Sequence, residues 1–296
     1  MYSRNEMFHS INFEKKLALK TYVKNFYDSR VIAENYMYKK QNAIETNELA
    51  YTKKQTKGFI DDKVLNLKKP ILSFFVSSDD EYRFIGSDWA GFGIPDQVKS
   101  IIKIAESSVS DNYDIVVKMH PNQKNIHKSI MEKYIELSKK VNVLFPTNKT
   151  DTYSLINHSS LIINFCSTVG AEANYLRKPV VQIGASRYRL LPVANYVNSA
   201  DEAIEVITQK KIKLMPKRSS IVYFCFHGKP PFRLDSYKWI ENGSFTYGNK
   251  LLVAPLYLRL LAVFDKLYTQ IISGNKEIYI NLLKYSRNLV LGKTKR

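Results

Sequence analysis

Short runs of apolar residues alternate with amphipathic stretches between residues 70 and 208. The first run, residues 71–76, is continuously apolar and is followed by polar residues, which predicts a buried strand. The stretch at 95–109 spaces its apolar residues for one helical face and begins with Pro95 and Asp96, residue types that start helices. The same criteria predict strands at 71–76, 114–119, 141–145, 160–165 and 179–183, and helices at 95–109, 126–140, 151–157, 168–176 and 201–208. This alternation is typical of an α/β fold with a doubly wound parallel sheet.

The segments on either side lack this alternation. Residues 12–57 carry apolar side chains at nearly helical spacing, which predicts one or two helices. Such a segment is about half of what a nucleotide-binding α/β domain needs, so we expect part of the domain to be missing upstream. Residues 251–273 are apolar but contain Pro255 and Asp265. A membrane-spanning helix needs about 20 mostly apolar residues, so we expect a helix packed on the protein or lying on a membrane surface.

The charge of the chain is concentrated at its ends. The net charge of +18 divides into +6 over residues 1–69, −1 over 70–208 and +13 over 209–296. We therefore predict three parts: a helical N-terminal segment at 1–69, a sheet domain at 70–208, and a basic, aromatic helical extension at 209–296. Cationic ends favour attraction to phosphate-bearing lipid or nucleic acid.

The cysteine content and the N-terminal residues bear on the cellular compartment. Cys166 and Cys225 are the two cysteines, and they form neither a disulfide framework nor a four-ligand zinc pattern. The first residues are charged and are not followed by the apolar core of a secretory signal. We therefore expect a cytoplasmic protein.

Polar residues follow the strands, at the edge of a parallel sheet where ligands gather. Lys118 and His120 end the predicted strand at 114–119, and Pro121 fixes the direction of the next turn. A histidine and a lysine at this position can bind a phosphate oxygen. The alternative is a strand-end histidine bonded to a neighbouring carbonyl group.

A second polar group follows the strand at 160–165. Ser167 and Thr168 offer hydroxyl groups to an anion and can cap the next helix, and Gly170 allows close approach to its backbone. Glu172 lies one turn later, where it can accept hydrogen bonds from ribose hydroxyls. An ordinary helix cap with an acidic first turn is the alternative interpretation.

A third group follows the strand at 71–76. Ser77 and Ser78 could bind phosphate, and Asp79 or Glu81 could act as a base or orient an acceptor hydroxyl. The alternative is a loop with solvated acids, which we favour slightly because acidic side chains repel an anionic donor.

Together these segments resemble the C-terminal domain of bacterial GT-B glycosyltransferases that build capsular and other surface polysaccharides. The resemblance covers about residues 70–208 and is most specific at 118–121, like the family's His-Pro motif, and at 167–181, like its Ser-Thr, Gly, Glu-Ala and Lys-Pro block. It implies a GT-B-like fold with a Rossmann-type nucleotide-sugar-binding domain. In similar enzymes the motif histidine and hydroxyls contact the donor phosphate, and the helix glutamate contacts the nucleoside. The matching residues here are His120, Ser167, Thr168 and Glu172.

The resemblance also implies a reaction and its participants. We expect transfer of a sugar from a nucleotide-sugar donor, CMP- or UDP-linked, to a polysaccharide or lipid-linked glycan, with no further cofactor. No Asp-x-Asp motif follows a strand, so we expect a metal-independent reaction in which positive groups stabilise the departing phosphate. Other capsule biosynthesis proteins and an anionic membrane surface are the expected partners, at the inner face of the cell membrane.

The sequence departs from the family pattern at its N-terminus. Similar enzymes bind the acceptor, and commonly place the base, in a first domain, whereas only 69 residues precede the sheet here. These residues contain no Asp/Glu-Gly loop that would supply a base. Either the chain is N-terminally shortened, or a partner completes it, or Asp79, Asp80 or Glu81 serves as the base.

Three other functions remain open. A CDP-glycerol-type glycerophosphotransferase also has a GT-B fold and a His-Pro segment. A protein that binds an anionic surface or nucleic acid would explain the charge and the aromatic residues of the C-terminal part, although no nucleic-acid-binding module is recognisable and nucleic acid is not expected. A non-catalytic remnant retained for assembly is the third.

Overall fold

The computed structural model describes residues 11–46, 51–78, 92–93, 95–230, 237–240, 244–247 and 250–252. These residues belong to two compact units. The first holds the described residues up to 126 and from 130 to 230, and the second holds residues 127–129 and those from 237 onward.

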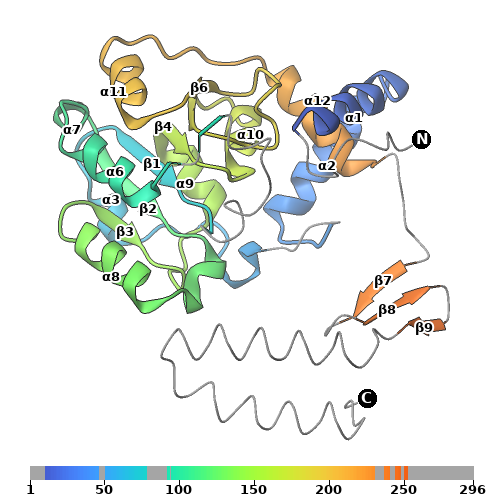
Figure 1. Cartoon of the computed structure of the whole chain (residues 1–296), viewed down its shortest axis with the longest axis horizontal. Helices are drawn as coiled ribbons and strands as arrows, with labels where there is room; N and C mark the ends of the chain where they lie inside the picture. The colour runs from blue at the N-terminus through green and yellow to red at the C-terminus, as the bar shows by residue number, and fades with distance from the viewer. Residues whose placement is uncertain are drawn as a thin grey trace, which may run out of the picture. The chain divides into compact units, whose positions relative to one another are not determined.

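A six-stranded sheet forms the centre of the first unit (Figure 1). All its neighbouring strands are parallel, and their order is β3-β2-β1-β4-β5-β6. The strands are β1 (Ile71–Phe75), β2 (Asp114–Lys118), β3 (Asn142–Leu144), β4 (Ser159–Asn164), β5 (Val180–Ile183) and β6 (Asn195–Val197). The predicted parallel α/β sheet is therefore confirmed. The direction of the strand order reverses between β1 and β4, and such a switch point is where doubly wound sheets bind ligands.

Helices cover both faces of this sheet. Apolar side chains of β1 alternate between the two cores: Leu72 and Phe74 enter one, and Ile71 and Phe75 enter the other. The first core is covered by α6 (Gln97–Ala105), α7 (Val109–Asn112), α8 (Lys128–Leu137) and α11 (Ala200–Thr208). The second is covered by α1 (Ile11–Lys24), α2 (Ser29–Gln41), α3 (Asp62–Leu65), α9 (Thr152–His158), α10 (Val169–Tyr175) and α12 (Lys217–Gly228).

Local signals in the sequence account for several helix starts. The carboxylate of Asp96 accepts a hydrogen bond from the backbone N–H of Lys99 at the start of α6, over 3.0 Å. Asp151 caps α9 and Ser199 caps α11 in the same way. Each cap satisfies backbone N–H groups that a helix terminus leaves without a partner, and is worth about 1 kcal/mol.

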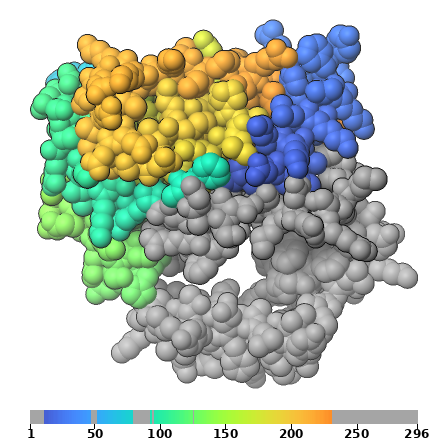
Figure 2. Space-filling view, turned by 45° about the horizontal axis from the view of Figure 1, so that its top comes forward, coloured from blue at the N-terminus to red at the C-terminus, as the bar shows by residue number. Residues whose placement is uncertain are grey.

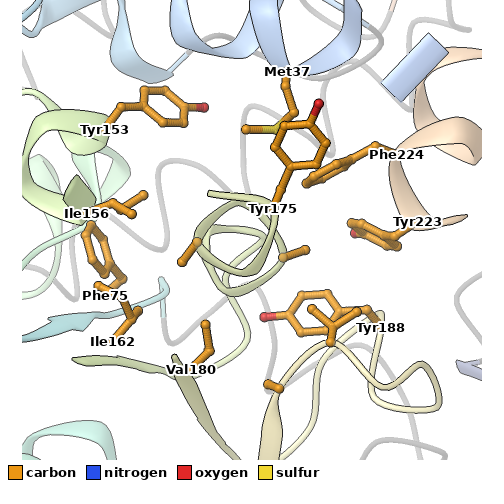
Figure 3. Packing of buried hydrophobic residues seen from close by; sticks show 14 of the residues in the cluster. Met37, Phe75, Tyr153, Ile156, Ile162, Tyr175, Val180, Tyr188, Tyr223 and Phe224 are labelled. Atoms are coloured by element: carbon orange, nitrogen blue, oxygen red, sulfur yellow. The ribbon is translucent and has the colours of Figure 1, made fainter. Parts of the chain in front are cut away.

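The N-terminal helices α1 and α2 pack against α12 on the second core, although about 180 residues or more separate them in the sequence. Tyr36 of α2 stacks on Phe224 of α12. Tyr175 of α10 meets the same ring edge-on (Figure 3). In the space-filling view the blue surface of the N-terminal helices borders the orange surface of the chain near α12 (Figure 2). The boundary between the two units falls between residues 231 and 232, and the predicted boundaries after residues 69 and 208 stay a prediction.

The second unit contains a three-stranded antiparallel sheet. Its strands, in the order β7-β8-β9, are β7 (Tyr237–Ile240), β8 (Ser244–Tyr247) and β9 (Lys250–Leu252). The prediction of a helical C-terminal extension holds for α12 but not for these residues. They are rich in aromatic and β-branched types such as Trp239, Phe245 and Thr246, which favour strands. The helix predicted at 251–273 lies beyond the described residues, apart from the end of β9.

Among the described helices, none is both long enough and apolar enough to cross a membrane.

Candidate functional site

A cleft opens at the carboxyl ends of β1, β2 and β4, at the switch point of the sheet. The segments that follow these strands supply its walls, and α2, η1 (Tyr51–Lys54), α9 and α10 close its sides. Five residues that the sequence singled out line this cleft together, although they come from two separate segments of the chain: Lys118, His120, Ser167, Thr168 and Glu172.

His120 is held by the short helix that follows it. It precedes η2 (Pro121–Asn125), and its Nδ1 accepts a hydrogen bond from the backbone N–H of Asn122 over 3.2 Å. Its own backbone N–H donates to the side chain of Gln123 over 3.0 Å. Because Nδ1 is the acceptor, this hydrogen bond assigns the proton of the neutral ring to Nε2. The hydrogen of the imidazole therefore lies on Nε2, and Pro121 fixes the direction of the chain after it.

A buried tyrosine holds the loop after β4 in place. The hydroxyl of Tyr188 donates to the carbonyl oxygen of Ser167 over 2.8 Å, and the amide nitrogen of Asn164 donates to the same oxygen over 2.8 Å. Tyr188 is 1% exposed, and its hydroxyl also contacts Gln182 at 2.9 Å. The Oγ of Ser167 in turn accepts a bond from the backbone N–H of Val169 over 3.3 Å. Ser167 therefore lies at the cleft on a backbone with little freedom to move.

Glu172 is buried at the side of the cleft, where its carboxylate has three partners. Oε2 accepts a hydrogen bond from the hydroxyl of Tyr153 over 3.0 Å, and Oε1 accepts one from Thr168 over 3.0 Å. The ammonium group of Lys40, from α2, lies 3.6 Å from Oε1. Burial and the adjacent Glu172 carboxylate raise the pKa of Tyr153 well above its usual value, so this hydroxyl stays a donor.

Lys118 is a buried lysine in the wall of the cleft. Its side chain is 6% exposed, and Nζ donates to the carbonyl oxygen of Thr150 over 2.8 Å. Burial lowers the pKa of Lys118 to about 8, against the opposing attraction of the Asp151 carboxylate. The folded protein therefore releases this proton near pH 8, whereas the unfolded chain holds it up to the ordinary value of 10.5. The cost of burying the charged lysine is present below pH 8, and the free energy of unfolding rises with pH between these two values.

The pKa of Lys118 predicts how phosphate binding depends on pH. Only the protonated ammonium group attracts a phosphate, so the affinity for a nucleotide should fall about tenfold between pH 7 and pH 9. Calorimetric titration with UDP or CMP at the two pH values measures this difference. Lys118→Met keeps the apolar stem without the charge and should show a flat profile. A slope in this variant equal to that of the unchanged protein would exclude Lys118 as its source.

Three predicted site residues lie elsewhere. Gly170 is buried in α10 against Tyr188 and Asn164 rather than at the cleft surface. Ser77 and Ser78 are buried after β1 and do not line the cleft. The backbone N–H and carbonyl groups of Ser77 form a reciprocal pair of 2.9 Å hydrogen bonds with the side chain of Gln97. Asp79, Asp80 and Glu81 lie outside the described residues.

The cleft also contains residues that the sequence did not reveal. Lys40 and Gln55 come from the N-terminal segment, and Tyr153 comes from the start of α9. The Gln55 side chain accepts hydrogen bonds from the backbone N–H and the hydroxyl of Thr152, which fixes η1 against α9. The lysine-rich N-terminal segment and the helix that begins at Asp151 were visible in the sequence, but neither pattern specifies a contact with Glu172. Among the described residues, no group of three or more His, Cys, Asp or Glu side chains is placed to hold a metal ion.

Comparisons with known proteins give one family. A family model described as capsule polysaccharide biosynthesis protein matches residues 5–214 of the chain. No curated protein matches it.

Several solved structures are similar at low sequence identity. KpsC of Thermosulfurimonas dismutans, a beta Kdo 2,4 transferase, is 13% identical with a TM-score of 0.36, and the match covers 67% of this chain and 55% of that one. The beta Kdo 2,7 transferase KpsC of the same organism is 16% identical with a TM-score of 0.40, covering 74% and 60%. HepE of Anabaena, in complex with UDP-glucose, is 14% identical with a TM-score of 0.34, covering 56% and 44%. The chain thus spans about half the length of the first of these structures.

Proposed function

The chain belongs to the capsule polysaccharide biosynthesis protein family, and from this premise we propose that it is a glycosyltransferase. It moves a sugar from a nucleotide-sugar donor to a growing capsular or other surface polysaccharide. The observation that carries the proposal is the convergence of His120, Ser167 and Lys118 on one cleft at the switch point of a parallel sheet. A cleft with this position and these donors suits the phosphate of a nucleotide.

The proposed role of this group is to bind the phosphate and to stabilise it as it departs. The Nε2–H of His120 and the hydroxyl of Ser167 are neutral donors, and Lys118 adds a positive charge when protonated. Negative charge grows on the phosphate as the bond to the sugar breaks. Donors held in fixed positions stabilise that charge without reorganising, which lowers the barrier to transfer. Lys40, whose ammonium group lies beside Glu172, brings a second ammonium group to the same cleft.

Glu172 is proposed to face the nucleoside, as the family resemblance implies. Its carboxylate already bonds to Tyr153 and Thr168, which fix its position and leave further lone pairs for a ribose hydroxyl. The acceptor hydroxyl must lose a proton during transfer, and the predicted base, Asp79 or Glu81, lies outside the described residues.

We further propose that the reaction does not require a metal ion. The support is chemical: the ammonium groups of Lys118 and Lys40 and the neutral N–H donor of His120 line the cleft, and they can bind a nucleotide phosphate without a metal ion. Transfer measured with and without a metal chelator tests this directly. Loss of activity with the chelator, restored by a divalent cation, would overturn this part of the proposal.

Nucleotide binding is the first experimental test. Thermal shift of the full chain with CMP, UDP, GDP and CDP should show stabilisation by one base type, because a ligand that binds only the folded state raises the melting temperature. At a ligand concentration about 100 times the Kd, the expected rise is on the order of 5 °C. No response to any nucleotide at millimolar concentration would contradict the proposed site.

The product identifies the reaction. Purified protein is incubated with nucleotide sugars, with CDP-glycerol and with an oligosaccharide acceptor, and the product mass is measured. Addition of a sugar residue supports a glycosyltransferase, whereas addition of glycerol phosphate identifies a glycerophosphotransferase instead. Nucleotide binding without any product would indicate a binding protein.

A further inference from the structure

The outward face of α1 and the turn after it carry two parallel rows of exposed side chains. One row is apolar, with Leu19, Val23 and Tyr27 exposed by 40%, 71% and 95%. The other consists of exposed lysines at the same spacing of four: Lys16, Lys20 and Lys24. Residues four apart lie above one another on a helix, so the two rows run side by side along α1.

Two further apolar side chains extend this surface beyond the helix. Phe26, in the turn, is 50% exposed, and Val31, at the start of α2, is 56% exposed. We call these five apolar residues and the three lysines the α1 surface. Residues 15–31 contain five basic residues and a single acidic one, Asp28. The α1 surface therefore combines exposed apolar area with a positive charge.

The inner face of α1 is buried against the first unit. On the inner side of α1, Ile11, Ala18 and Thr21 are buried. Glu14 is also buried and accepts a hydrogen bond from Arg187, in the loop after β5, over 2.9 Å. The exposed rows are thus presented outward by a helix attached to the first unit.

We propose that the α1 surface docks on an anionic lipid bilayer. Apolar side chains of an interfacial helix enter the boundary between headgroups and acyl chains, while lysines beside them keep their ammonium groups at the anionic headgroups. Leu19, Val23 and Val31 are aliphatic and cannot stack on bases, so the chemistry favours a bilayer over nucleic acid. The proposal does not depend on the transferase activity, because vesicle binding needs neither donor nor acceptor.

Vesicle co-sedimentation of the full chain tests the docking. We expect binding to vesicles of equal parts phosphatidylglycerol and phosphatidylcholine, and much weaker binding to phosphatidylcholine alone. Lys20→Gln/Lys24→Gln should weaken partition about fivefold for each lysine removed. Val23→Asn/Tyr27→Asn should weaken it by about tenfold through lost apolar burial. Both variants should keep the nucleotide response and the melting temperature of the unchanged protein.

Matched variants away from α1 serve as controls. Lys99→Gln/Lys133→Gln removes two exposed lysines from α6 and α8, and Ile135→Asn removes an apolar side chain that is 48% exposed. Neither should change vesicle binding. Equal binding by the α1 variants and the controls would overturn the proposal. A dimer, or a complex with RNA, that the α1 variants lose while vesicle binding is unchanged would also overturn it.

A local fluorescence signal separates direct insertion from an indirect effect. Tyr27→Trp is made in a background in which Trp89 and Trp239, the two native tryptophans, are replaced by Phe. Its emission should move to shorter wavelength with anionic vesicles and should be quenched by brominated lipid. Emission that anionic vesicles leave unchanged would contradict insertion at this surface.

Discussion

His120→Ala should weaken nucleotide binding by about 10-fold to 100-fold, the loss expected when one hydrogen bond to a charged phosphate is removed. The ring is held with Nδ1 bonded to the backbone of Asn122, which directs the proton to Nε2 at the cleft. No other imidazole lines this cleft among the described residues. Calorimetric titration with the nucleotide that gives the largest thermal shift measures the change, and kcat/KM for the donor should fall at least as far.

Two further variants separate the phosphate contact from the local fold. His120→Asn places an amide oxygen near the position of Nδ1, so it can still accept the bond from Asn122, but it has no donor at the Nε2 position. Its stability should match that of the unchanged protein, while its nucleotide affinity should be as low as that of His120→Ala. His158→Ala, an exposed histidine at the end of α9, is the matched control. Full affinity in both His120 variants would remove this residue from the proposed site.

The sheet could be predicted because its signals are local. Each strand from β1 to β5 is a short apolar run, and caps such as Asp96 and Asp151 mark the helices between them. Within this six-stranded sheet only β6, a short strand with two half-buried residues, escaped this pattern. The position of the site at one edge of the sheet then followed from geometry, since parallel strands place their carboxyl ends together. His120 and Ser167 were therefore correctly expected to meet, although 46 residues separate them in the sequence.

The missing part of the site depends on contacts between distant segments. Lys40 reaches Glu172 because α2 packs on α12, which also packs on α10, and no local pattern specifies which helices share a face. Tyr153 likewise lies in a helix whose apolar spacing predicts burial but not a partner. Gly170 shows the opposite problem. Its sequence context suggested backbone approach by a ligand, whereas in the fold its open side faces the buried hydroxyl of Tyr188.

Gly170→Ala should destabilise the protein more than an ordinary glycine substitution does. A Cβ atom at this position would lie 2.2 Å from the hydroxyl of Tyr188 and 3.0 Å from the amide nitrogen of Asn164. Tyr188 is fully buried and its hydroxyl is bonded to Ser167, Gln182 and Asn164, so the ring cannot move aside without breaking those bonds. Overpacking of this kind costs about 1–3 kcal/mol, which lowers the melting temperature of a chain this size by roughly 2–10 °C.

A double-mutant cycle identifies the clash as the cause. Tyr188→Phe removes the atom at 2.2 Å, so Gly170→Ala should cost at least about 1 kcal/mol less in that background than in the unchanged protein. Gly58→Ala is the control, because its added Cβ has no atom within 4 Å and only its φ of 80° carries strain, worth about 1–2 kcal/mol. Since Tyr188 also holds the carbonyl group of Ser167, Gly170→Ala should weaken nucleotide binding as well, whereas Gly58→Ala should not. Equal costs in both backgrounds, with nucleotide affinity unchanged, would mean that Tyr188 neither excludes a side chain at residue 170 nor positions the phosphate loop.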